Sequence, residues 1–185
     1  AHAGTAVRFV EGISSATGLA DGGADIVTVS QALHWMEPEP TFAEIARILR
    51  PGGVFAAYDC DWPPTFNREL EHAYDRCMDR AQQLERQLRV TPDVRKWSKE
   101  AHLNRIRESR RFTYVKEAVF HHIESGGAER IIGLALSQGM LASLLKHGLS
   151  EAQIGIEALR ETAKRVLGDA IVPWYWSYRV RIGIK

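Results

Sequence analysis

The stretch Ala-Asp-Ile-Val-Thr-Val-Ser-Gln-Ala-Leu-His-Trp-Met, residues 24–36, decides the fold. It is apolar and β-branched over residues 26–29 and turns polar and aromatic after them. A short run without polar alternation is typical of a strand buried on both faces, so we expect a strand at residues 25–29. In open α/β sheets, ligands bind just beyond the carboxyl ends of the strands. Residues 30–35 are therefore either the start of a binding site or an ordinary loop with Trp35 in the core.

The segments around this strand alternate between strand and helix. Residues 5–11 are predicted to form a short strand, which a loop rich in Ser, Ala and Gly follows. Thr-Phe-Ala-Glu at residues 41–44 matches a capping box, so we expect a helix to begin there and to end at Pro-Gly-Gly, residues 51–53. A second buried strand is expected at residues 54–58. This order predicts an α/β fold with a doubly wound, mostly parallel sheet.

Beyond residue 64 the chain is expected to be mainly helical, with inserted helices and one further strand. Helices are predicted at residues 66–88, 94–109 and 128–138 and after a capping box at 150–153, and a strand at 112–122. In the last segment, apolar Trp174, Trp176, Tyr178, Val180, Ile182 and Ile184 alternate with more polar residues. Such alternation predicts one buried and one wet face, as in an antiparallel C-terminal strand near a sheet edge. We expect a single domain over residues 1–185, with a helical insertion or lid at 65–111.

The composition excludes several classes of protein. The chain has 185 residues with 24 basic and 23 acidic side chains, a net charge of +1, so nothing favours nucleic acid or an acidic membrane surface. No apolar run approaches the roughly 20 residues of a spanning helix, and no signal-peptide pattern opens the sequence. The two cysteines have no metal-ligand spacing and are too few for a disulfide framework. We expect a cytoplasmic protein without a metal site.

Four segments together resemble the class I S-adenosylmethionine-dependent methyltransferases, in the small-molecule branch of the ubiquinone-biosynthesis and trans-aconitate types. They are Val-Arg-Phe-Val-Glu-Gly at 7–12, Asp-Gly-Gly-Ala-Asp-Ile-Val at 21–27, Gln-Ala-Leu-His-Trp at 31–35 and Ile-Leu-Arg-Pro-Gly-Gly at 48–53. The resemblance implies a partial Rossmann-like fold, S-adenosylmethionine as cofactor and a small-molecule methyl acceptor.

The resemblance also implies roles for particular residues. His34 follows the central strand and has an unperturbed pKa of roughly 6.5, which suits a general base; the alternative is a hydrogen bond within its loop. Asp59, Asp61 and Trp62 follow the next strand as candidate acceptor-binding residues, or as a capped loop with a packed Trp. The residues implied on the cofactor side are Ile13, Ser14, Ser30, Gln31, Ala32 and Trp35.

One part of the family pattern is missing from this sequence. The Gly-x-Gly-x-Gly loop after the family's first strand, and the acidic residue that holds the ribose, have no counterpart here. Ile13 stands where many relatives carry an Asp, which leaves the Ser14 amide to contact adenine. We therefore expect weak cofactor binding by this chain alone. We also expect the outer edge of the strand at residues 25–29 to be covered, either by residues 5–11 or by a homodimer partner or second chain that completes the sheet. The alternative function is a non-catalytic, methyltransferase-like binding or assembly protein.

Overall fold

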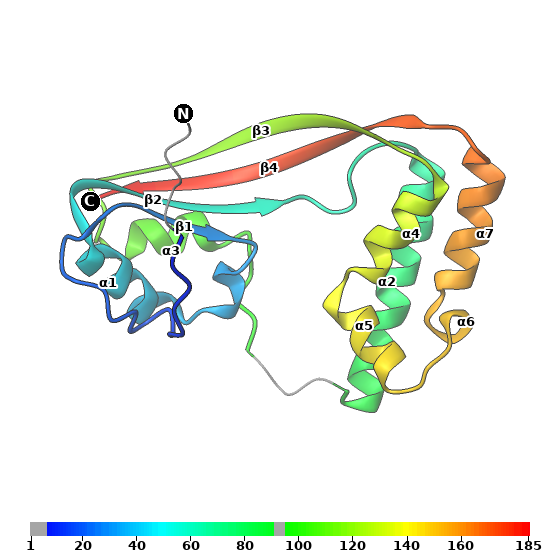
Figure 1. Ribbon diagram of the computed structural model, residues 1–185, viewed down its shortest axis with the longest axis horizontal. Helices are drawn as coiled ribbons and strands as arrows, with labels where there is room; N and C mark the ends of the chain where they lie inside the picture. Colours follow the sequence, from blue (N-terminus) through cyan, green and yellow to red (C-terminus); the bar gives the residue numbers. More distant parts are fainter. Residues whose placement is uncertain (1–6, 91–94) are drawn as a thin grey trace. The chain divides into compact units, whose positions relative to one another are not determined.

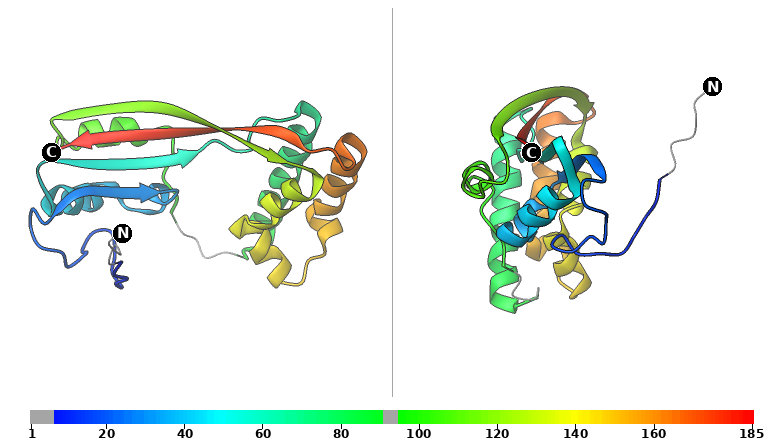
Figure 2. Two further views of the ribbon diagram at one scale, coloured as in Figure 1. Left: turned by 45° about the horizontal axis from the view of Figure 1, so that its top comes forward. Right: turned by 90° about the vertical axis from the view of Figure 1, so that its left-hand side faces the viewer.

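The computed structural model describes residues 7–90 and 95–185. Its four strands are β1 (Ala24–Ser30), β2 (Leu49–Cys60), β3 (Tyr114–Gly126) and β4 (Val172–Ile184), in the sheet order β1-β2-β4-β3 (Figure 1, Figure 2). β1 and β2 are parallel, with Ser30 opposite Tyr58. β4 runs antiparallel to β2, because the Gly52 amide donates to Lys185 O and the Asp61 amide to Ser177 O. The predicted fold class is confirmed: a mostly parallel α/β sheet with one antiparallel strand.

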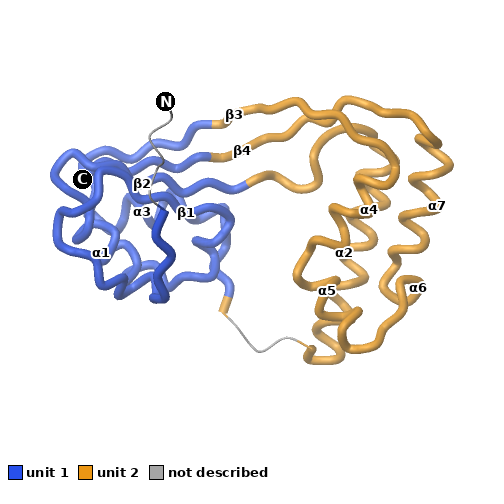
Figure 3. The backbone as a smooth tube through the Cα atoms, in the orientation of Figure 1, with its two compact units in different colours: residues 1–59, 96–118, 180–185 blue, residues 60–95, 119–179 orange. Residues whose placement is uncertain are grey.

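The chain divides into two compact units (Figure 3). Unit 1 comprises Ala1–Asp59, Lys96–Ala118 and Val180–Lys185, and unit 2 comprises Cys60–Arg95 and Val119–Arg179. Each has its own apolar core. That of unit 1 is formed by Val29, Leu33, Phe42, Ile45, Leu49, Phe55, Ala57, Ile106 and Phe112.

The first helix of unit 1, α1 (Pro38–Ile48), begins earlier than predicted. Proline is tolerated in the first turn, where an amide would lack an intrahelical partner anyway. The N-cap is Glu37, so the predicted capping box is wrong: Thr41 is buried inside the helix and its amide donates to Glu37 O. The helix ends at Ile48, and β2 begins directly after it.

The second helix of unit 1, α3 (His102–Glu108), is shorter than the predicted helix. Residues 96–101 form no helix, and residue 94 lies outside the described residues. A one-turn 3₁₀ helix, η1 (Leu33–Trp35), follows β1.

Unit 2 is built on α2 (Arg68–Leu88), which packs against α4 (Ala128–Leu136), α5 (Gly139–Lys146) and α7 (Ile156–Leu167) (Figure 1). The predicted apolar stripe of α2 is buried except at Leu88. The capping box at Ser150 is confirmed, but its helix α6 (Glu151–Ile154) ends at Gly155, which has a φ of +97°. The sequence did not predict α5. Along residues 7–90 and 95–185, no helix combines the length and hydropathy that crossing a bilayer would take.

β1 lies at one edge of the sheet, and two predictions about this region are wrong. Among its residues only Val29 is buried, while the side chain of Ile26 is 62% exposed. The predicted strand at residues 5–11 is not formed over 7–11, and residues 5 and 6 lie outside the described part. Phe9 and Val10 are exposed instead. Ile26 and Thr28, which point to the opposite face from Val29, are exposed, so one face of β1 is uncovered. No described residue pairs with its outer edge.

We predict that a second chain covers the outer edge of β1. A free strand edge is a template for pairing, and a lysine on such a strand disfavours it. Light scattering should find the wild-type protein larger than a monomer and Thr28→Lys shifted toward the monomer. The same charge change on an exposed face of α7, Ala158→Lys, should leave the mass unchanged. A monomeric wild-type protein would contradict this prediction.

Candidate functional site

The turn after β1 presents the first group of predicted site residues. Gln31 has a φ of +51°, a left-handed conformation that is costly for a residue other than glycine. Its amide donates to Tyr58 O at 2.9 Å, which ties the turn to the end of β2. Leu33 anchors η1 in the core, whereas the side chain of Trp35 is 47% exposed. The prediction of Trp35 as a core residue is therefore wrong.

Asp59 lies near the carboxyl end of β2 and is buried. Its Oδ2 accepts a hydrogen bond from Arg181 Nη1 at 2.7 Å, and Arg181 Nε donates to Glu117 Oε2 at 2.8 Å. Lys99 Nζ lies 3.1 Å from Asp59 Oδ1. The Asp59 carboxylate thus joins residues of β2, β3, β4 and the segment before α3.

That segment, residues 96–99, contacts the turn after β1 at three points. The Trp97 amide donates to His34 O at 2.8 Å, and Lys99 Nζ donates to Gln31 Oε1 at 3.2 Å. The Lys96 ammonium lies 4.6 Å from the centre of the Trp35 ring. The 96–99 segment therefore brings the residues after β1 and Asp59 into one site.

Two histidines of this site are held neutral. Burial lowers the pKa of His34, as does the charge of Lys99, and the charge of Asp59 opposes the shift. Burial also lowers the pKa of His102 to about 4, again partly opposed by Asp59. A neutral imidazole can take up a proton, so His34 has the protonation state that a general base needs at neutral pH.

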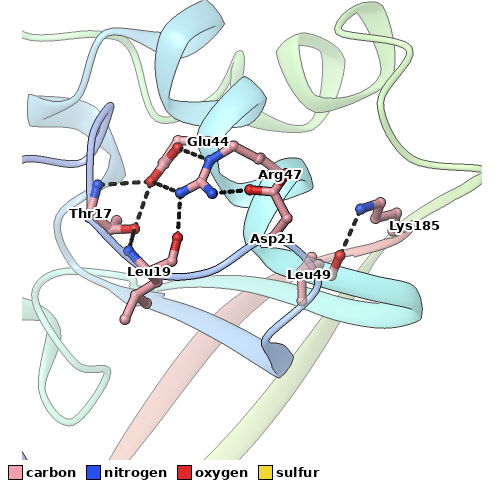
Figure 4. Close-up of polar contacts among 7 residues, drawn as sticks. All are labelled: Thr17, Leu19, Asp21, Glu44, Arg47, Leu49 and Lys185. Carbon is pink, nitrogen blue, oxygen red and sulfur yellow. Dashed lines mark hydrogen bonds and ion pairs between the residues drawn. The ribbon is translucent and has the colours of Figure 1, made fainter.

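The loop that carries Ile13 and Ser14 is fixed on α1 (Figure 4). Glu44 Oε1 accepts hydrogen bonds from the Thr17 amide at 2.8 Å and from Arg47 at 2.8 Å, and Arg47 also pairs with Asp21. The Arg47 hydrogen bonds, followed by those from Thr17, lower the pKa of Glu44 to about 2. The Ser14 hydroxyl lies 3.0 Å from that of Thr41, and the Ile13 side chain is 66% exposed.

The other two predicted acceptor-binding residues belong to unit 2. Asp61 forms an ion pair with Arg179 at 3.0 Å. Trp62 is partly exposed and meets the ring of Trp176 edge-on, with the ring centres 5.4 Å apart. Trp174 and Trp176 are core residues, as predicted.

Sequence reasoning missed four residues of the site, namely Glu117, Lys99, His102 and Arg181. Arg181 is 3% exposed although the alternation of the last strand placed it on the wet face. In the part of the chain that the structure describes, no three His, Cys, Asp or Glu side chains are grouped so as to hold a metal ion. A hollow in unit 2 is lined by Gly127, Arg130, Lys164 and Asp169 among others, and it contains none of the predicted site residues.

Comparison with known proteins shows similarity to methyltransferases over the first part of the chain. Residues 1–57 match the family model of a methyltransferase domain. The resemblance to class I methyltransferases is confirmed. An uncharacterized methyltransferase of Mycobacterium tuberculosis is 51% identical over 35 residues, which are 19% of this chain and 14% of that protein's length.

Two solved structures are similar to this chain. A proposed type II methyltransferase from Anaeromyxobacter dehalogenans has a TM-score of 0.60 at 18% identity over 92% of this chain and 68% of its own. A proposed methyltransferase from Bacillus halodurans has a TM-score of 0.47 at 15% identity over 97% of this chain and 78% of its own. At 18% identity, the first of these similarities supports the fold alone.

Removing Arg181 should destabilise the protein strongly. Arg181→Met leaves the buried Asp59 carboxylate with only Lys99 beside it, and we expect a loss of about 3 kcal/mol of unfolding free energy. The half-exposed pair of Arg179 and Asp61 offers a matched control, since Arg179→Met should cost less than about 1 kcal/mol. Denaturant unfolding of both variants measures the difference. Equal losses of unfolding free energy in the two variants would show that the buried ion pair contributes no more than the half-exposed one.

The neutral His102 predicts a pH dependence of stability. Its pKa is about 4 in the folded protein and 6.5 ordinarily, so below pH 6.5 the unfolded chain binds more protons than the folded one. The stability that His102 contributes is present above pH 6.5 and is lost as the pH falls toward 4, by up to about 3 kcal/mol. In denaturant unfolding at several pH values, His102→Asn should flatten this dependence. Substitution of the exposed His72 by Asn should not, and identical pH profiles for the two variants would contradict the assignment.

Proposed function

We propose that this chain acts in the transfer of a methyl group from S-adenosylmethionine to a small-molecule acceptor. The observation that carries the proposal is the convergence of Gln31, His34 and Trp35 with Asp59 at the carboxyl ends of two parallel strands. The first three of these residues lie in the segment 1–57, which matches the methyltransferase family model. Ligands of open α/β sheets bind at this edge.

The residues present fit one part of a cofactor site. The partly exposed Trp35 and the residues before it, Ser30, Gln31 and Ala32, are proposed to line one side of it, and the Ser14 amide is proposed to contact adenine. The sequence offers no glycine-rich loop for the methionine portion. When bound, the cofactor supplies a sulfonium-activated methyl group. This chain alone should therefore bind it weakly.

The roles of the chain's own residues follow from their protonation states and positions. His34 is neutral and accepts the proton that an acceptor loses when it is methylated. The ion pairs of Asp59 with Arg181 and Lys99 fix its carboxylate at the end of β2. Asp61 and Trp62 remain proposed acceptor contacts. A second chain that pairs with β1 is the proposed partner, and it would extend the sheet on the cofactor side.

Titration with S-adenosylhomocysteine followed by NMR tests the proposal. The protein has five tryptophans, so its indole N–H signals can be assigned one by one. The signal of Trp35 should shift progressively with ligand, while those of the buried Trp174 and Trp176 should not. Calorimetry with S-adenosylmethionine should show no dissociation constant in the low-micromolar range. An unresponsive Trp35 at millimolar ligand would favour the non-catalytic alternative, and tight binding would refute the predicted weakness.

Substitution of Trp35 separates a site role from a structural one. Because the side chain is half-exposed, Trp35→Ala should lower the melting temperature by far less than the loss of a core Trp, which costs roughly 3–5 kcal/mol. It should abolish the cofactor response of the His34 ring signals. Trp174→Ala, in the core of unit 2, is the destabilising reference. A large drop in melting temperature for Trp35→Ala would count against the site role.

A further inference from the structure

Three buried polar atoms of unit 1 have no hydrogen-bond partner among the described residues. They are His34 Nδ1, Asp59 Oδ1 and His102 Nε2. Lys99 forms an ion pair with Asp59 Oδ1, but its orientation does not make a hydrogen bond. A buried polar atom without a partner costs roughly 1–3 kcal/mol, and few native proteins leave many of them. Three in one unit indicate a site that takes a polar group.

The three side chains come from segments that contact one another. The turn before His34 is tied to Tyr58, the residue before Asp59, by the hydrogen bond from the Gln31 amide. The Trp97 amide donates to His34 O, and the His102 amide donates to Lys99 O at 3.2 Å. Each histidine is within electrostatic reach of Asp59, and His102 is within reach of His34. The unpartnered atoms therefore belong to one region.

The chemistry of these atoms restricts what the region can bind. A carboxylate paired with Arg181 and Lys99 only accepts hydrogen bonds, so the group at Asp59 Oδ1 must donate one. A neutral imidazole ring offers one donor and one acceptor nitrogen. A second ammonium would be repelled by Lys99, which already lies 3.1 Å from Asp59 Oδ1. A carboxylate has no hydrogen to donate, whereas a neutral hydroxyl both donates and accepts.

We propose that His34, Asp59 and His102 bind the hydroxyl group of a neutral acceptor, an alcohol or a phenol. His102, which follows the 96–99 segment, is thereby a ligand-binding residue. The inference rests on the proposed function in one respect, which is that the hydroxyl compound is the methyl acceptor. The binding site itself stands on the three unpartnered atoms and can be tested without cofactor.

Phenol and its methyl ether, anisole, form the matched pair of probes. They have nearly the same shape, but only phenol can donate a hydrogen bond to Asp59. Side-chain ¹⁵N NMR of the histidines reports on each ring separately. Phenol should shift the ring signals of His34 and His102 saturably, and the loss of one buried hydrogen bond should weaken anisole about tenfold. Benzoate and benzylammonium, which test an anion and a cation, should be at least as weak as anisole.

Variants assign the response to the site. His102→Phe should reduce the affinity read from the His34 signals about tenfold, since it removes both ring nitrogens at a similar volume. His102→Asn serves the same purpose if the Phe variant does not fold. His121→Asn is the control, because His121 is exposed in unit 2 and contacts Ser177 instead. It should bind phenol as the wild-type protein does.

Each outcome decides between readings. Equal affinities for phenol and anisole would show that the aromatic ring alone drives binding, and this would overturn the proposal. The absence of any response to phenol would also overturn it and would leave ordered water as the partner of these atoms. If benzoate or benzylammonium binds more strongly than phenol, the site takes a charged group and the proposed hydroxyl ligand is wrong. If Trp35 responds to S-adenosylhomocysteine while the histidines ignore phenol, this inference fails and the proposed function survives. If the histidines respond to phenol while Trp35 does not respond to S-adenosylhomocysteine, the hydroxyl site stands and its link to methyl transfer is refuted.

Discussion

The burial of one negative charge, that of Asp59, is the constraint on which unit 1 depends. A carboxylate removed from water must be paired with cations and supplied with hydrogen bonds, or it cannot remain ionised. Arg181 and Lys99 meet this requirement, and Glu117 in turn satisfies Arg181. Because these residues come from separate parts of the chain, satisfying one charge fixes the relative positions of β2, β3, β4 and the 96–99 segment within the unit. The pairing of this charge therefore positions the residues of the candidate site, in addition to the sheet itself.

The same pairing explains the unusual local features of the turn after β1. Gln31 adopts a left-handed conformation that its side chain does not favour, and its amide oxygen accepts from Lys99. Strain of this kind persists where surrounding contacts determine the backbone. Lys99 thus pairs with the Asp59 carboxylate and also donates a hydrogen bond to the turn. Lys96, from the same segment, lies over the ring of Trp35. Burial, with the charges of Lys99 and Lys96, lowers the pKa of His34, and the charge of Asp59 opposes the shift.

The sequence allowed the fold class and the turn from Gln31 to Trp35 to be predicted, because a β-branched run and an apolar stripe depend on local periodicity. It did not allow Arg181 to be found. Alternation along a strand assigns its residues to two faces on the assumption that only one face is covered. Nothing in the local sequence around Arg181 indicates that it pairs with a carboxylate some 120 residues earlier. His102 was missed for a related reason, since a helix was expected to run through residues 94–109. The predicted burial of β1 failed because an apolar run does not reveal which faces of a strand other elements cover.

The interleaving of the two units bears on how the protein is made. Unit 1 uses residues from the start, the middle and the end of the chain, and unit 2 uses the stretches between them. Unit 1 cannot be completed before Arg181 and its strand have been synthesised, long after Asp59. Until then the carboxylate of Asp59 stays in water and β2 lacks its neighbour β4. Such late closure leaves an unpaired strand edge open to wrong partners during synthesis.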